Sequence, residues 1–155
     1  MAGVEFSFRH LLAPVGAWGR HFTVFLNATM LDVRGDRQAD FTGYIRDSRS
    51  WGVTFARKPV TIMAKWNWRG EQQNSALAAA TYGTNAYNYT GPRTQLDLNV
   101  DYQFGRRMSL FVNARNLFDA RNVLLRYGTE TPGYAKIFQS ADYGAQLSAG
   151  IKGSF

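Results

Sequence analysis

The side chains of this chain that could do chemistry point to binding rather than to catalysis. Three tyrosines, Tyr82, Tyr87 and Tyr89, lie close together in a polar stretch rich in Gly, Asn and Thr. A tyrosine ring offers flat, amphipathic contact area, which binding loops often use. We expect these residues to contact a ligand, and packing of the loops against one another is an equally good interpretation of them.

Basic side chains suggest a second kind of site. Four of them lie on the polar sides of alternating segments and could attract an anionic ligand: Arg9, Lys65, Arg69 and Arg115. The commoner role of such residues is ion pairing with acids on the same face, here Asp97 and Asp101, because a charge held in a folded protein needs a partner.

Metal chemistry and catalysis are not indicated. His10 and His21 are the only histidines and lack metal-ligand spacing. The absence of Cys excludes a disulfide scaffold, a zinc ribbon and a thiol nucleophile. A membrane-barrel hydrolase would need a Ser or Asp beside a His at the open rim, and both histidines fall near predicted short turns. We expect no enzyme activity, no metal and no cofactor.

The net charge and the short apolar runs exclude further classes of protein. The net charge is +7, but the basic residues form no basic helix and no cluster with a stacking motif, so we expect no nucleic-acid binding. Apolar runs such as 77–80 are far shorter than the roughly 18 residues of a membrane helix. Residues 1–20 do not form a secretory signal, because Glu5 and Arg9 interrupt the apolar residues.

Strands must position these side chains, because apolar and polar residues alternate with period two in most segments. The clearest cases are 96–104 and Val60–Arg69. Seven strands are predicted: 4–9, 21–30, 51–56, 60–69, 96–104, 108–115 and 143–155. Short connections (13–19, 57–59 and 105–107) alternate with long polar ones (34–50, 70–93 and 128–142), and 122–127 is interpreted as an extension of the sixth strand.

Three features favour a membrane β-barrel. The strands approach the 9 to 11 residues that cross a bilayer at a tilt. Aromatic residues flank the apolar faces, as interfacial girdles do: Trp51, Trp66, Trp68, Tyr102 and Phe155. The opposite faces carry Asp, Asn, Gln, Lys and Arg, which a dry core could not bury without partners.

Two segments near the C-terminus resemble a known family. NARNLFD at 113–119 precedes the final run YGAQLSAGIKGSF. Together they resemble the last segment of TonB-dependent outer-membrane receptors, and the residues that carry this family motif are Asn113, Asn116, Leu117, Phe118 and Asp119. The final run also resembles the assembly signal of outer-membrane proteins, carried here by Ser148, Gly150 and Phe155.

The resemblance implies an all-β fold: an antiparallel transmembrane β-barrel segment with short periplasmic turns and long extracellular loops. Residues 1–155 would be the last seven strands of a 22-stranded receptor barrel, with the signal peptide and the plug domain absent from this chain. Seven strands do not close alone, because single-chain bacterial barrels have an even number of strands.

The implied function is active transport across the bacterial outer membrane. The receptor would take up a scarce nutrient such as a ferric siderophore, haem, cobalamin or an oligosaccharide, energised through TonB. The implied partners are that nutrient, outer-membrane lipid and lipopolysaccharide, the barrel assembly machinery, and TonB through the missing N-terminal part. Loop arginines could meet lipopolysaccharide phosphates or be solvated loop charge: Arg34, Arg37, Arg46 and Arg49.

Two other classes stay open. A small porin-like or structural outer-membrane barrel would explain the strands but not residues 113–119. A soluble lipocalin-like ligand-binding barrel would turn the apolar face inward.

Overall fold

Two antiparallel β-sheets make up most of the protein. The computed structural model describes residues 2–33, 42–82 and 85–153. Its one α-helix in these ranges is the single turn α1 (Ala79–Tyr82), so the all-β prediction is confirmed. None of the helices in the described ranges has the length and apolar character needed to cross a membrane.

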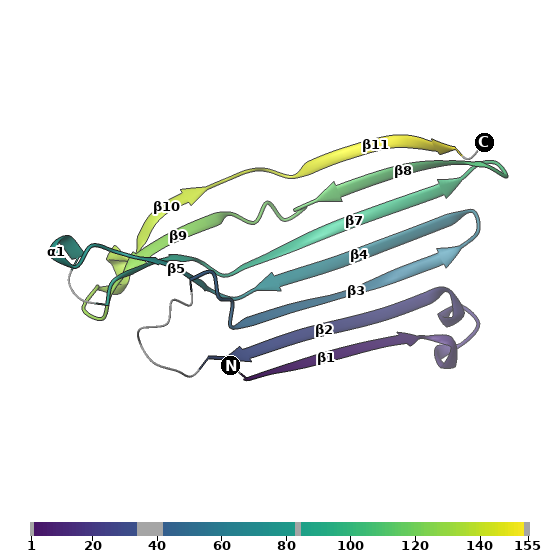
Figure 1. Ribbon diagram of the computed structural model, residues 1–155. Coiled ribbons are helices and arrows are strands. Elements are labelled where there is room, and N and C mark those ends of the chain that lie inside the picture. The colour runs from purple at the N-terminus through teal and green to yellow at the C-terminus, as the bar shows by residue number, and fades with distance from the viewer. Residues whose placement is uncertain (1, 34–41, 83–84, 154–155) are drawn as a thin grey trace.

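The larger sheet contains seven strands that lie side by side in chain order (Figure 1). They are β1 (Ala2–Leu11), β2 (Phe22–Asp32), β3 (Asp47–Arg57), β4 (Val60–Arg69), β7 (Arg93–Gln103), β8 (Met108–Arg115) and β11 (Gln146–Gly153). All seven predicted strands are therefore present. The third and fifth begin earlier than predicted, at Asp47 and Arg93, and the last begins later, at Gln146 rather than at 143.

The smaller sheet was missed by the sequence patterns. It has the order β10-β9-β6-β5 and contains β5 (Gln72–Ala76), β6 (Tyr87–Thr90), β9 (Asn122–Tyr127) and β10 (Ile137–Ala141). The predicted loops 70–93 and 128–142 contain three of these strands, and 122–127 is a separate strand that follows a turn. The alternating stretches in these strands are short and mostly polar, so the local pattern does not mark them as strands. Their backbone hydrogen bonds come from pairing with one another.

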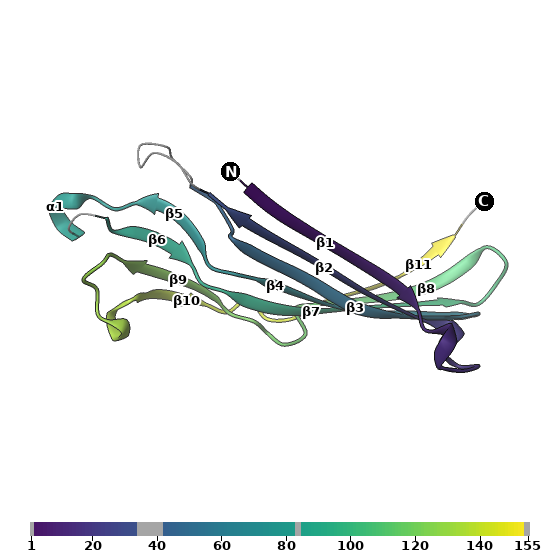
Figure 2. The same ribbon diagram turned by 90° about the horizontal axis from the view of Figure 1, so that it is seen from below.

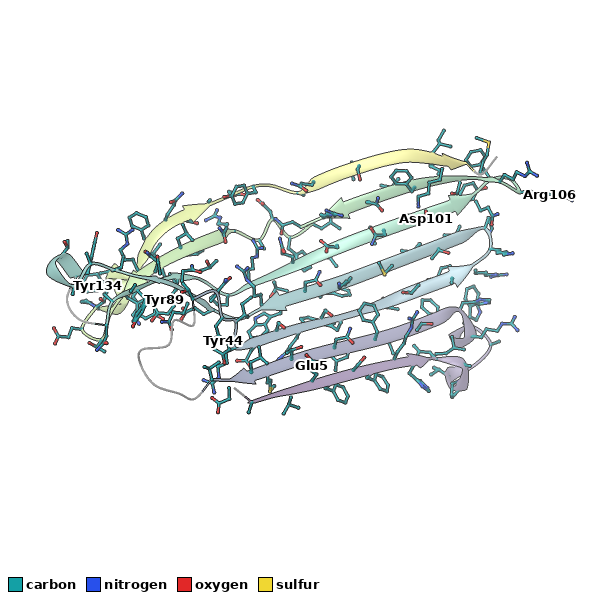
Figure 3. The ribbon with its side chains drawn as sticks, in the orientation of Figure 1. Glu5, Tyr44, Tyr89, Asp101, Arg106 and Tyr134 are labelled. Carbon is teal, nitrogen blue, oxygen red and sulfur yellow. The ribbon has the colours of Figure 1, made fainter. Side chains whose placement is uncertain are left out.

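The connections are segregated by length. Short connections join β1 to β2, β3 to β4 and β7 to β8 at one end of the larger sheet, which we call the short-turn end. The smaller sheet lies beyond the opposite end, and Figure 2 shows its strands continuing outward from there. In Figure 3, Arg106 marks the short-turn end, and Tyr89 and Tyr134 mark the opposite end.

One face of the larger sheet is apolar across all of its strands. Residues that pair directly across antiparallel strands share a face, so the register can be followed from strand to strand. One such row runs Val24, Val53, Ala64, Leu98, Ala114, Leu147. Charged residues of this face lie only close to strand ends: Asp32, Asp47, Arg49 and Arg57.

The opposite face is polar and has two hollows. A hydrogen-bonded row crosses β1 to β3: Ser7 Oγ donates to Asn27 Oδ1 at 2.8 Å, and Asn27 Nδ2 donates to Ser50 Oγ at 3.4 Å. Two hollows, of about 530 and 520 Å³, open on this face. Side chains of this face line both hollows.

Two aromatic rings on the polar face cover glycines. Phe25 lies opposite Gly52, and Phe111 lies opposite Gly150. A Cβ atom on either glycine would approach the facing ring to 2.8 Å or less. Phe111, which interrupts the predicted alternation, therefore packs on Gly150, in the manner of an aromatic ring that covers a strand glycine.

Neither face of the larger sheet is covered by a second layer. The buried hydrophobic residues within the described ranges are Ala86 and Ala114, and no large side chain there is fully buried. The apolar face exposes Val4, Phe6, Leu147 and Ile151 by 53% or more. The outer strands β1 and β11 each pair with one neighbour only.

Candidate functional site

The most buried polar side chain of the described residues lies in segment 113–119, which resembles the receptor motif in sequence. Asn116, 7% exposed, lies in the turn between β8 and β9. Its amide Nδ2 donates to the carbonyl oxygens of Gly144, at 3.2 Å, and Ala120, at 3.5 Å. Its Oδ1 accepts from the Ala120 backbone N–H at 2.9 Å, and its own backbone N–H donates to Asp97 Oδ1 at 3.1 Å. Asn116 thus joins β7 and two turns.

The two turns have matching backbone geometry. Asn116 and Asp119 have φ values of 56° and 50°, and Gly144, between β10 and β11, has φ of 68°. Asn and Asp tolerate this left-handed region better than other non-glycine residues. These residues therefore have a structural role here: they form the irregular connection through which the chain passes from the larger sheet to the smaller one.

The other motif residues are placed around this turn. Asn113 lies on the polar face of β8, opposite Ser148 of β11. Leu117 donates its backbone N–H to Leu96 O at 2.8 Å, and its side chain and that of Phe118 are exposed. A hydrogen bond to Asp142 raises the pKa of Asp119, and the same bond lowers the pKa of Asp142. As the pH rises, Asp142 therefore loses its proton before Asp119 does.

The predicted ligand-binding tyrosines lie in or beside the smaller sheet. The rings of Tyr89 and Tyr127 stack with centroids 4.1 Å apart and an interplanar angle of 12°, and Tyr87 meets Tyr89 edge-on at 6.3 Å. Tyr127 Oη donates to Glu71 Oε1 at 2.6 Å. Tyr89 thus packs against Tyr87 and Tyr127, and the ligand-binding role of Tyr87 and Tyr89 stays a prediction.

Tyr82 lies apart from that stack and contacts Arg126. The Arg126 guanidinium donates to Tyr82 Oη at 3.1 Å and to Asn88 Oδ1 at 3.1 Å. It also lies over the Phe138 ring, 3.7 Å from the centroid. Tyr82 and Phe138 line a pocket of about 270 Å³ together with Arg126. One arginine thus links α1, β6, β9 and β10.

Burial changes the acidity of the stacked tyrosines. Burial, and then the hydrogen bond to Glu71, raise the pKa of Tyr127 well above its usual range. Burial and the negative charge of Glu71 also raise the pKa of Tyr89. Both phenols are therefore neutral at physiological pH.

The predicted basic residues fall on the polar face. Lys65 and Arg115 line the 520 Å³ hollow together with Arg93, and Arg69 lies opposite Arg93 in the register. We call Lys65, Arg69, Arg93 and Arg115 the basic cluster. Arg9, the fourth predicted cation, is on the same face but on β1.

The predicted acidic partners behave differently from each other. Asp97 accepts hydrogen bonds from Asn67 Nδ2, at 3.0 Å, and from the Asn116 backbone, rather than pairing with a predicted cation. Asp101 forms an ion pair with Lys152 at 2.6 Å, in the hollow at the short-turn end (Figure 3).

The predicted assembly-signal residues Ser148 and Gly150 lie on the polar face of β11, and Phe155 lies outside the described residues, as do Arg34 and Arg37. Arg49 lies over the Trp68 ring at 5.1 Å. His10 stacks on Phe8, and His21 Nδ1 lies 3.2 Å from Ala56 O. No group of three or more His, Asp or Glu residues in the described ranges is arranged to hold a metal ion.

Comparison with known proteins gave no match: no family model, no curated protein and no solved structure resembles this chain significantly.

Sequence reasoning missed four residues of these clusters: Glu71, Arg93, Arg126 and Tyr127. The short alternations YNYT and NVLLRY were the available signal for β6 and β9, since both place aromatic or aliphatic residues at every second position. Arg93 precedes the alternation by which the fifth strand was predicted. Pairing between segments 38 or more residues apart, such as Arg126 with Asn88 and Tyr127 with Glu71, is not visible locally.

Proposed function

We propose that this chain is the C-terminal part of the transmembrane β-barrel of a TonB-dependent receptor in the bacterial outer membrane. The receptor takes up a scarce nutrient such as a ferric siderophore, haem, cobalamin or an oligosaccharide. One observation carries the proposal: an apolar face runs across seven strands, opposite the face that holds the hollows, and no described residues form a layer over it. A hydrocarbon environment removes this surface from water without a second sheet.

Several details support the membrane environment. The strands have 8 to 11 residues, and a transmembrane strand needs about 9 to 11. Trp51 pairs with Trp66 near one border of the apolar face. Near the other border, the ring centroids of Phe22 and Phe55 lie 5.0 Å apart. Aromatic residues favour both membrane interfaces.

The position of the hollows weighs against the lipocalin-like alternative. A lipocalin-like barrel places its apolar face inside the curve to hold an apolar ligand. Here the hollows open on the polar face, so closure would enclose the polar side chains and leave the apolar ones outside.

Strand direction bears on how the barrel closes. Every neighbouring pair in the larger sheet is antiparallel, so β1 and β11, the first and seventh strands, run in the same direction. An antiparallel barrel needs an odd number of further strands between these two edges, and 15 more would give the proposed 22. A porin-like barrel with fewer added strands is the second candidate, and the turn formed by 116–119 favours the receptor because it matches the receptor motif in sequence.

The membrane part of the proposal is tested by cysteine labelling, for which a chain without native cysteine is well suited. Leu98→Cys lies on the apolar face of β7 and Asn99→Cys on its polar face. In intact outer membranes, we expect a small, charged thiol reagent to modify Asn99→Cys and to leave Leu98→Cys unmodified. Modification of both positions, or recovery of the protein from the soluble fraction, would refute membrane insertion.

The receptor part is tested by sequencing the DNA upstream of Met1. We expect an in-frame extension of several hundred codons that encodes further strands, a plug domain and a signal peptide. A start codon at Met1 with its own promoter would instead support the porin-like barrel.

A further inference from the structure

Two arginines of the basic cluster face each other without a negative charge between them. Arg69 of β4 lies directly opposite Arg93 of β7 on the polar face. Like charges at opposite positions of antiparallel strands destabilise a sheet. In addition, Arg69 Nε is buried and has no hydrogen-bond partner, and an unsatisfied buried donor of a charged group is costly.

The surrounding residues do not neutralise this charge. Lys65, Arg93 and Arg115 line the 520 Å³ hollow, and Asp97, which lies opposite Lys65 in the register, is the one acidic residue among its described lining residues. Both Asp97 oxygens already accept hydrogen bonds, from Asn67 and from the Asn116 backbone. The basic cluster forms no ion pair with any described residue.

The cations of the hollow at the short-turn end are either paired or exposed. Lys152 pairs with Asp101 at 2.6 Å, and Lys58, Arg106 and Arg107 are exposed turn residues. The basic cluster has four cations and one nearby carboxylate, so most of its positive charge has no negative partner among the described residues.

We propose that the basic cluster binds a small polyanion, a molecule with two or more carboxylate or phosphate groups; this rests on the proposed function, since it names the class of nutrient taken up. Guanidinium groups bind carboxylates and phosphates through paired hydrogen bonds. A volume of about 520 Å³ suits a small molecule, because ligand sites span roughly 300 to 1,000 Å³. Gln95, Asn99 and Gln146 also line the hollow and supply neutral hydrogen-bonding groups.

Calorimetric titration tests the proposal. The full gene product that carries this chain, purified in detergent, is titrated with citrate and, separately, with pyrophosphate. The neutral trimethyl ester of citrate serves as the control ligand. We expect at least one of the two anions to bind and to raise the Tm, and the ester to do neither.

Two substitutions locate the site. Arg93→Gln and Arg69→Gln are each expected to weaken anion binding about tenfold or more, the effect of losing one charge-assisted contact. Each also removes the repulsion between the two arginines, so the Tm without anion should equal or exceed that of the unchanged protein. A loss of binding would then not be a loss of folding. Arg9→Gln, the same change on the same face of β1, should leave binding unchanged.

Three results would overturn the inference: neither anion binds, the ester binds as well as citrate, or both variants bind as the unchanged protein does. Failure of the proposed function is a separate result, because it would change the labelling of Leu98→Cys and Asn99→Cys. An unchanged labelling pattern without anion binding would refute the polyanion site alone.

Discussion

Asn116 and Gly144, 28 residues apart, are joined by a hydrogen bond of 3.2 Å from the Asn116 side-chain amide to the Gly144 carbonyl oxygen. Both residues have left-handed backbone conformations, and each lies where a strand of the larger sheet meets a strand of the smaller one. The bond therefore ties the β8–β9 connection to the β10–β11 connection.

Replacing Asn116 should destabilise the protein. Asn116→Ala removes the side-chain bonds to Gly144 and Ala120, and each buried group left unsatisfied costs about 1 to 3 kcal/mol. We expect a loss of about 2 to 4 kcal/mol, measured as the urea midpoint of unfolding in detergent. Leu117→Ala, next in the chain and exposed, is the control. Equal midpoints for the two variants would contradict the role assigned to Asn116.

The Asp119 and Asp142 carboxyl groups should make the same turn sensitive to pH. The pKa of Asp119 is raised by the bond to Asp142, so its contribution is present at low pH and is lost as pH rises through that pKa. The pKa of Asp142 is lowered, so its contribution is present at neutral pH and is lost as pH falls through that pKa.

Asp119→Asn keeps a hydrogen-bond donor at every pH. We therefore expect this variant to unfold at a higher temperature than the unchanged protein at neutral pH, and the difference to shrink in acid. Thermal unfolding over a series of pH values measures it. A difference that does not vary with pH would contradict the raised pKa of Asp119.

The stacked tyrosines should lose their phenolic protons only at unusually high pH. Burial and the bond to Glu71 raise the pKa of Tyr127 above the ordinary value of 10.0, so its stabilising contribution persists below that value and is lost as pH rises through the shifted pKa. Alkaline titration, followed by phenolate absorbance, should show a late phase. Tyr127→Phe should remove part of that phase, and Tyr134→Phe, a change at a 90% exposed ring, should not.

Glycine positions on the polar face should differ in tolerance. A Cβ on Gly52 would overlap the Ala64 carbonyl oxygen as well as Phe25, whereas a Cβ on Gly150 would meet only the Phe111 ring. Overpacking costs about 1 to 3 kcal/mol, and a backbone atom relaxes less than a ring does. We expect Gly52→Ala to lower the urea midpoint more than Gly150→Ala does, and Gly105→Ala, with its nearest atom 4.0 Å away, to be neutral.

A charge should be tolerated on one face of β7 only. Leu98→Arg places a cation at mid-strand on the apolar face, which costs about 2 to 4 kcal/mol in a bilayer. Asn99→Arg places it on the polar face. We expect Leu98→Arg to reduce the amount of folded protein recovered from outer membranes and Asn99→Arg to leave it near normal. The reverse order would show that the apolar face does not meet lipid.

The sequence by itself determined the all-β class, the seven strands of the larger sheet and the two faces of each strand. These features are local, since period-two alternation fixes which side chains share a face wherever the strand pairs. Residues 60–69 and 96–104 illustrate this: they were predicted from alternation alone, and their apolar members pair in register.

Only the tertiary structure decided the smaller sheet, the partners of Asp97 and the opposition of Arg69 and Arg93. Each depends on which distant segments pair and in what register, and short polar strands such as β6 carry little local signal for either. The same holds for Tyr89, which the sequence offered equally as a ligand contact or a packing residue, and whose stacking on Tyr127 arises from pairing of β6 with β9. The physical chemistry of a single segment does not specify which distant segment it pairs with.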